Sequence, residues 1–293
     1  QPEETALDSE DSFDTVDTSP PPPCAQEESE PNNNGDGSDA NWVELEQWAC
    51  GTLHYADFDY FRFEVPEPCW IKMDMNAASQ GSAADPYIVL DSEGGERVTS
   101  IGDVDSTDPF VIFPVEEADE WVLMVKDFSS QDPGDDYHYE WMATVTKAPV
   151  TWTHNEDRTN GVPLPWDSSK QAMVLEEGMV IFGRAFETLE EDWYLVQTPP
   201  DKHEVIVSVT AFAAGSPMDA RMKLYDSVAT QLEIAHRGTQ AYDRDPVITR
   251  NSDGDEDWWL VVREEDGASG GSAYWYTIEV EFADGKRLIV LAE

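Results

Sequence analysis

The chain carries one run of short motifs twice, in the same order. The repeated pairs are 59–63 with 192–196, 85–90 with 219–224, and 120–125 with 257–262. Their offsets are 133, 134 and 137 residues, so the spacing drifts by only four residues. An order kept at a nearly constant period indicates a tandem duplication. The sequence therefore predicts two similar folding units in series, and a length of 293 residues suits two domains.

Within each copy, apolar residues alternate with polar ones. In 59–65, Phe61 and Phe63 share one side of an extended segment, and 205–211 shows the same pattern. A period of two is typical of half-buried antiparallel strands. Clusters of Gly, Pro, Asp and Ser separate these segments, and no stretch has the pattern of a long amphipathic helix. The sequence predicts an all-β chain of the sandwich type.

The first 27 residues differ from the rest of the chain. They are rich in Asp and Glu, contain no Lys or Arg, and include four prolines at 20–23. Such a segment cannot bury enough apolar surface to offset its ordering entropy, so we expect a tail there. The predicted organisation is an acidic Pro-rich tail over 1–27, a first sandwich over 28–147, a second over 148–287, and a C-terminal strand or tail over 288–293.

The charge of the chain narrows its choice of partners. It has 17 Lys and Arg residues against 62 Asp and Glu residues, a formal net charge of −45. Phosphate binding needs clustered Lys and Arg, so this balance argues against a nucleic-acid partner and against docking on anionic lipid. No apolar run approaches the ~18 residues of a membrane-spanning helix, so we expect no membrane insertion.

The first residues suggest a location for the protein. The sequence opens with Gln-Pro and has no initial Met. We therefore expect that a leader has been removed, and that the protein is secreted and lies outside the cell or on the cell surface.

Three cysteines occur, at 24, 50 and 69, and their spacing matches no zinc or haem pattern. Cys50 and Cys69 flank the same expected strand region and are a candidate disulfide pair. Cys24 lies in the Pro-rich tail and would then remain unpaired. Three small free or buried thiols are the alternative interpretation.

Four further motifs lie in order in the first copy. They are Glu-Ser-Glu-Pro-Asn-Asn at 28–33, Gly-Thr-Leu at 51–53 followed by Asp-Phe-Asp-Tyr-Phe at 57–61, Asp-Pro-Tyr-Ile-Val-Leu-Asp at 85–91, and a closing hairpin at 121–125 and 137–145. Region 28–147 thereby resembles the bacterial pre-peptidase C-terminal domains, a family that includes the collagen-binding domains of bacterial collagenases. The second copy, about 150–285, is recognisable mainly through the first. The resemblance implies jelly-roll-like antiparallel β-sandwiches that are non-catalytic parts of secreted proteins.

The same resemblance implies a Ca²⁺ site in the first copy. Ca²⁺ takes ~6–8 hard oxygen ligands, which an acidic segment and an Asp-x-Asp strand start can supply. The alternative is a solvated acidic tip. In the second copy, Arg158 lies in the corresponding stretch and Glu191-Asp192 replaces Asp-x-Asp, so we expect no equivalent site there. The expected ligands in the first copy are Glu28, Glu30, Asn32, Asn33, Asp57 and Asp59.

A second acidic motif is a weaker metal candidate. Its members, Asn251, Asp253, Asp255 and Asp257, are spaced like the start of a Ca²⁺ loop. The motif lacks the Gly at loop position 6 and the Glu at position 12 that such loops use. An acidic turn before the strand at 258 is the favoured interpretation.

Three tryptophans are candidates for a binding surface. Trp193, Trp259 and Trp275 fall on the strand phase opposite the expected core. If exposed, they would form a surface for a polymeric ligand.

No catalytic motif stands out. The chain has no Gly-x-Ser-x-Gly, His-Glu-x-x-His or phosphate-loop pattern, and its five histidines are scattered. We therefore expect no enzyme, but a Ca²⁺-stabilised extracellular structural or adhesive protein. It would be a subunit of a surface or fibre assembly, bound through its terminal extensions to itself or to another extracellular protein or polysaccharide. The alternative is a polysaccharide- or fibrous-protein-binding module that targets a partner hydrolase.

Overall fold

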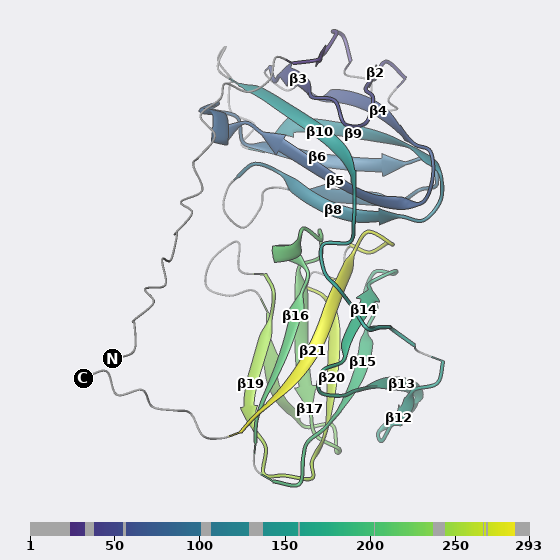
Figure 1. The fold of residues 1–293 in the computed structure, drawn as a ribbon, viewed down its shortest axis with the longest axis vertical. Helices are drawn as coiled ribbons and strands as arrows, with labels where there is room; N and C mark the ends of the chain where they lie inside the picture. The colour runs from purple at the N-terminus through teal and green to yellow at the C-terminus, as the bar shows by residue number, and fades with distance from the viewer. Residues whose placement is uncertain are drawn as a thin grey trace, which may run out of the picture.

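The computed structural model describes residues 24–32, 38–54, 57–100, 107–128, 137–157, 159–201, 203–236, 244–265, 267 and 269–284. In these residues the chain is all-β, as predicted, and its strands form four sheets (Figure 1). Two short 3-10 turns, Ala78–Gln80 and Phe212–Ala214, interrupt the strands. None of the described helical turns is long or apolar enough to cross a membrane.

The strands between Gln26 and Thr146 form two five-stranded sheets. In spatial order, the first sheet contains β1 (Gln26–Glu27), β3 (Ala49–Thr52), β10 (His138–Thr146), β5 (Cys69–Asn76) and β8 (Phe110–Val115). The second contains β2 (Asn41–Trp42), β4 (Asp59–Val65), β9 (Asp119–Asp127), β6 (Pro86–Ser92) and β7 (Arg97–Ser100).

The strands between His154 and Asp284 repeat this arrangement. One sheet contains β11 (His154–Asn155), β14 (Val180–Arg184), β21 (Trp275–Asp284), β16 (His203–Thr210) and β19 (Val247–Asn251). The other contains β12 (Val162–Leu164), β13 (Asp167–Leu175), β15 (Asp192–Gln197), β20 (Asp257–Glu264), β17 (Ala220–Tyr225) and β18 (Gln231–Ala235). Apart from the added strand β12, the two pairs of sheets share one strand order, as expected for duplicated units.

The sheets are mixed, whereas the alternation predicted purely antiparallel ones. Parallel pairings join β1 to β3, β2 to β4, β11 to β14, and β13 to β15. Strands β1, β2 and β11 have two residues each, which is too short to produce an alternating pattern in the sequence. The pairings of these three edge strands therefore become visible only in the folded chain.

The core of each sandwich lies between its two sheets. Phe61 and Phe63 of β4 and Val207 of β16 point inward, as the alternation predicts, and all three are buried. The Phe61 ring packs edge-on against Trp141 of β10 with centroids 5.2 Å apart. Burial of such apolar surface is the main favourable term in folding, and the buried apolar residues of both copies belong to one cluster.

An aromatic cluster joins the two sandwiches. The Trp275 ring lies 5.4 Å from the Trp70 ring, and Phe182 stacks on Trp152 with centroids 4.5 Å apart. The Trp275 indole N–H also donates to the Ile112 carbonyl at 2.7 Å. Because Trp70 and Ile112 belong to the first sandwich and Trp275 to the second, these contacts pack the two units, seen one above the other in Figure 1, against each other.

Candidate cation site

The segment 24–32 lies along the edge of the first sandwich. The disulfide Cys24–Cys50, with Cα atoms 6.1 Å apart, links it to β3. The Glu28 N–H donates to the Cys50 carbonyl at 2.9 Å. On the other side, the Ser29 N–H donates to Asn41 Oδ1 at 3.0 Å. These contacts hold the segment in place over the start of β4.

The disulfide is not the pair that the sequence suggested. Cys50 is bonded to Cys24, and Cys69 is a free thiol. Strand β10 separates β3 from β5, and the register places Asn76, not Cys69, at the level of Cys50. Cys69 begins the eight-residue strand β5 and lies at its opposite end. At about 3.3 Å per residue, that distance is far beyond the reach of a disulfide.

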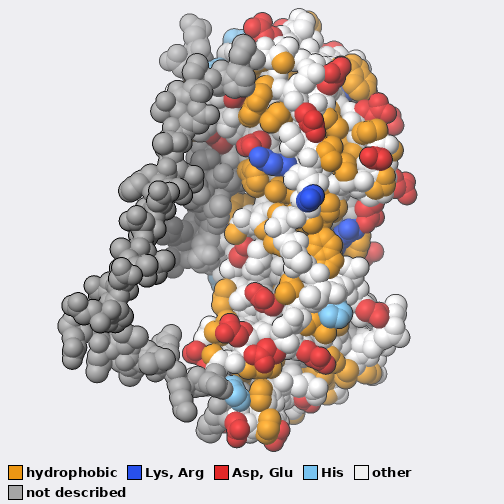
Figure 2. Space-filling model, in the orientation of Figure 1, with side chains coloured by type: hydrophobic (Ala, Val, Ile, Leu, Met, Phe, Trp, Pro, Cys, Tyr) orange, Lys and Arg blue, Asp and Glu red, His pale blue; other side chains and the backbone are white. Residues whose placement is uncertain are grey.

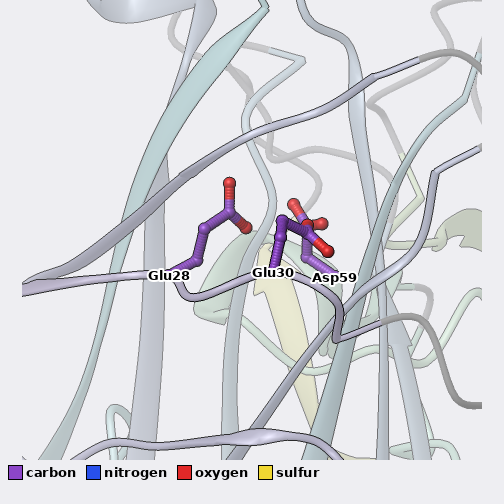
Figure 3. A group of neighbouring side chains, drawn as sticks. All are labelled: Glu28, Glu30 and Asp59. Atoms are coloured by element: carbon purple, nitrogen blue, oxygen red, sulfur yellow. The ribbon is translucent and has the colours of Figure 1, made fainter.

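Three carboxylates converge where the segment meets β4. One oxygen each of Glu28, Glu30 and Asp59 lies within 4.8 Å of the others (Figure 3). Glu28 and Glu30 come from the segment, and Asp59 is the first residue of β4. Within the described part of the chain, no other three His, Cys, Asp or Glu side chains meet this closely.

Each carboxylate accepts a hydrogen bond from another described residue. Glu28 Oε1 accepts from the Thr52 N–H at 2.6 Å, and Glu30 Oε2 accepts from the Asn32 N–H at 2.9 Å. Asp59 Oδ2 accepts from the buried Tyr139 hydroxyl at 2.5 Å. These bonds fix one oxygen of each carboxylate, and the Asp59 and Asn32 side chains also interact with Glu28.

The remaining oxygens are buried and lack a partner. Glu28 Oε2, Asp59 Oδ1 and both polar atoms of the Asn32 amide have no hydrogen bond among the described residues. Asp59 and Asn32 are both 0% exposed. A buried polar atom without a partner costs free energy, and a buried charge costs more. A cation with oxygen ligands would satisfy these atoms together.

Proton affinity at this site is strongly raised. Burial, followed by the nearby charge of Glu28, raises the pKa of Asp59 to about 9, although the Tyr139 hydroxyl opposes the shift. Burial also raises the pKa of Glu28. Without a cation, Asp59 therefore holds a proton at neutral pH.

Gly51 has no side chain, and this leaves space for Tyr139 and Glu28 at the site. A Cβ at this position would lie far inside van der Waals contact with the Tyr139 hydroxyl and Glu28 Oε2. The close approach of β3 to β10 is therefore possible only without a side chain.

We expect Gly51→Ala to abolish cation binding, because the added methyl displaces both Tyr139 and Glu28. Gly183→Ala is the matched control, since its Cβ would meet Tyr276 in the second copy in the same way. Titration calorimetry with Ca²⁺ should show binding lost in the first variant and retained in the second. Equal retention in both variants would contradict this placement of the site.

The structure brings together Glu28, Glu30, Asn32 and Asp59, whereas Asn33 lies outside the described residues. Asp57 is not part of the group. Its carboxylate accepts from the N–H groups of His54 at 3.1 Å and Phe58 at 3.2 Å. Its charge still contributes to the raised pKa of Asp59.

Sequence reasoning missed Tyr139 and Thr52. The repeated Tyr-x-Tyr at 137–139 and 274–276 was the available signal for the tyrosine, but strand alternation explains that pattern equally well. Thr52 acts through its backbone N–H, a group that nearly every residue type has, so the sequence gives no signal for it.

The second acidic motif forms a turn. Glu256 accepts from the Asp253 N–H at 3.0 Å and the Ser252 hydroxyl at 2.9 Å. Asp257 accepts from Gln197 Nε2 at 3.1 Å. The described carboxylates of Asp253, Asp255 and Asp257 do not converge as those of the first site do. The favoured interpretation, an acidic turn before β20, agrees with this geometry.

The expected exposed tryptophan surface is wrong for two of its members. Trp275 is 0% exposed because the first sandwich covers it. Trp259 is 4% exposed because Trp166, in the turn between β12 and β13, covers this face with its ring 5.8 Å away. Trp193 is half-buried in the same cluster, with Lys170 Nζ 5.3 Å from its ring centroid. Strand phase identified the outer face correctly but could not show what packs on it.

The second copy keeps part of the site. The Glu156 N–H donates to the Phe182 carbonyl at 2.9 Å, as Glu28 does to Cys50. The Tyr276 hydroxyl donates to Asp192 Oδ2 at 2.6 Å and lies 2.7 Å from the Tyr194 hydroxyl. Tyr194 stands where the first copy has Phe61.

The strand register of the second copy also shows which of its residues corresponds to Glu30, the third carboxylate of the first site. Strand β11 pairs with β14 as β1 pairs with β3, so residue 156 corresponds to residue 28. The same count places Arg158, which lies outside the described residues, at the position of Glu30. Among the described residues, three converging carboxylates therefore occur in the first copy alone.

Comparison with known proteins gives a likeness in fold. No protein-family model matches the chain, and no curated protein matches it. A solved pre-peptidase C-terminal domain of collagenase from Bacillus anthracis matches at 17% identity over 36% of this chain and 94% of that one, with a TM-score of 0.30. It carries the name of the family that the motifs of the first copy resemble.

Two other solved structures match most of the chain. Tandem CBM51 modules of a glycoside hydrolase from Streptococcus pneumoniae match at 10% identity over 82% of this chain and 85% of that one, with a TM-score of 0.24. The CUB1-EGF-CUB2 region of human MASP-1/3 matches at 9% identity over 78% of this chain and 95% of that one, with a TM-score of 0.22. Likeness at these identities concerns the fold and leaves function to the residues of the site.

Proposed function

We propose that this chain is a non-catalytic extracellular binding protein whose first sandwich is completed by a bound Ca²⁺ ion. The observation that supports the cation is the convergence of Glu28, Glu30 and Asp59 around buried oxygens without partners. The side chains that converge here, Glu28, Glu30, Asn32 and Asp59, offer carboxylate and amide oxygens, which suit Ca²⁺ and not the nitrogen and sulfur preference of zinc.

The ion would join two parts of the chain. Glu28, Glu30 and Asn32 would bind it from segment 24–32, and Asp59 would bind it from β4. Its charge would offset the mutual repulsion of the carboxylates and supply the partner that the buried oxygens lack. The role is structural, because it fixes the segment that leads into the first sandwich.

The chemistry of the surface limits the partners. Figure 2 shows acidic side chains spread over one face, with few basic ones among them. We propose another extracellular protein, a polysaccharide or a second copy as the partner, in solutions where salt or Ca²⁺ screens the charge. The terminal extensions expected to mediate assembly include residues 1–23 and 285–293, which lie outside the described residues.

A pH dependence tests the cation site. Because the pKa of Asp59 is about 9 without a cation, Ca²⁺ must displace its proton at neutral pH. We expect the apparent affinity to rise ~tenfold per pH unit up to that pKa and then to level off. Calorimetry at pH 7 in buffers of different ionisation enthalpy should show about one proton released per ion bound.

The control for this experiment is Asp59→Asn, which has no proton to release. We expect this variant to lose both the proton release and most of the affinity. The proposed site is wrong if the wild-type chain binds no Ca²⁺, or if Asp59→Asn binds it as tightly as the wild type.

A further inference from the structure

We propose that the Cys24–Cys50 disulfide and the cation site are coupled, so that the chain binds Ca²⁺ tightly only after the disulfide has formed. This inference rests on the proposed function. It adds a condition, an oxidising environment, under which the proposed site is complete.

The disulfide and the site share one short segment. Cys24 lies four residues before Glu28. Cys50 is bonded to Cys24 and also accepts the Glu28 N–H at 2.9 Å. The next residue but one on the same strand, Thr52, donates its N–H to the Glu28 carboxylate. One stretch of β3 therefore holds both the sulfur bridge and the first cation ligand.

Besides the disulfide, hydrogen bonds hold the segment, including those from the N–H groups of Ala25 and Gln26 to the Trp48 carbonyl. Strand β1 has only two residues, and it pairs in parallel with Ala49 and Cys50. Ser29 adds its hydrogen bonds with Asn41. Ordering so short a segment costs conformational entropy that two pairs of strand residues offset only weakly. The disulfide is the one covalent cross-link from this segment to β3. It restricts the segment even when the hydrogen bonds of β1 and Ser29 open.

The ligands of the site come from two separate parts of the chain. Glu28 and Glu30 belong to the segment, whereas Asp59 belongs to β4, so the three carboxylates meet only while the segment lies against the sheet. If the segment were free to move away, Glu28 and Glu30 would separate from Asp59 and the ligand set would disperse. The disulfide prevents that separation, so it preorganises the site for the ion.

Linkage makes the effect reciprocal. If the disulfide raises the affinity for Ca²⁺, then bound Ca²⁺ must favour the disulfide by the same factor. Both cysteines are half-buried, so a small dithiol can reach them when the segment opens. Its thiolate attacks one sulfur and releases a cysteine thiolate, and its second thiol then displaces the other cysteine. Two protein thiols and one cyclic disulfide of the reductant result.

Cys69 does not take part in this exchange. It lies on β5, on the far side of β10 from Cys50 and at the other end of the sheet. The folded chain therefore has one disulfide arrangement, and its loss frees the segment. In the oxidising surroundings expected outside the cell, the disulfide and hence the cation site are formed, whereas reducing surroundings leave the site dispersed.

The test uses the full chain and Ca²⁺ alone as the probe. Titration calorimetry compares the oxidised wild type, the wild type kept in dithiothreitol, and the Cys24→Ser/Cys50→Ser double variant. We expect both chains without the disulfide to bind on the order of 10-fold more weakly, within the range of about 5–150-fold typical of coupled sites. Cys69→Ser is the matched control and should bind as the wild type does.

A second measurement needs no variant that might fail to fold. The rate at which dithiothreitol reduces the wild-type disulfide should fall in millimolar Ca²⁺ relative to EDTA, and added NaCl of equal ionic strength should not reproduce the decrease. Equal Ca²⁺ affinity with and without the disulfide, or reduction rates that do not depend on Ca²⁺, would overturn the coupling alone. An oxidised wild type that binds no Ca²⁺ would overturn the proposed function as well.

Discussion

Calcium should raise the unfolding temperature of the wild-type chain, and Asp59→Asn should remove most of that rise. A ligand that binds only the folded state adds stability that grows with its concentration, about 2.7 kcal/mol at 100 times the dissociation constant. Asp59 contributes a buried oxygen without a partner, so its loss removes the ligand that ties β4 to the segment. Calorimetric scans in EDTA and in millimolar Ca²⁺ measure the difference.

The matched control is Asp192→Asn in the second copy. Asp192 is buried and accepts from Tyr276 just as Asp59 accepts from Tyr139. We expect this variant to keep the full response to Ca²⁺, whatever its effect on stability in EDTA. An equal Ca²⁺ response in both variants would place the ion elsewhere.

The stability of the chain without Ca²⁺ also depends on the pH at which the scans are made. In EDTA the folded pKa of Asp59, about 9, exceeds its ordinary value, so the folded chain holds a proton that the unfolded chain has released. Stability from this group is therefore present at low pH and is lost as pH rises from about 4 to about 9. Asp59→Asn should flatten that part of the decline, and at neutral pH it replaces a carboxyl group that is already uncharged.

Trp275→Ala should destabilise the chain by about 3–5 kcal/mol and loosen the two sandwiches from each other. The Trp275 side chain is fully buried, packs 5.4 Å from Trp70, and donates to the Ile112 carbonyl. Truncation would leave a cavity between the two units and an unpaired carbonyl at its edge. Denaturant unfolding would measure the loss, and small-angle scattering would measure an increase in the radius of gyration.

Trp42→Ala is the matched control for size and chemistry. Trp42 is 59% exposed, so we expect a change within about 0.5 kcal/mol and an unchanged radius of gyration. If Trp275→Ala cost no more than Trp42→Ala, the aromatic cluster would not be what holds the sandwiches together.

Much of the site was predictable from residue types. The acidic motif at 28–32 and the aspartate at the start of β4 carry the carboxyl groups, and their chemistry is the same wherever the chain places them. The selection among them was not predictable. Asp57 is two residues from Asp59 and of the same type, but it caps the backbone at His54 and Phe58 while Asp59 turns inward. That choice depends on the path of a loop, which residue types do not specify.

The sequence by itself determined the all-β class, the duplication and the acidic surface. These follow from local periodicity, from repetition and from composition, and each can be read without knowing which strands are neighbours. Only the tertiary structure decided the partner of Cys50, the burial of Trp275 and the role of Tyr139. Alternation shows which side of a strand a residue takes. What lies against that side depends on strand order and on how two units pack, and those are properties of the whole folded chain.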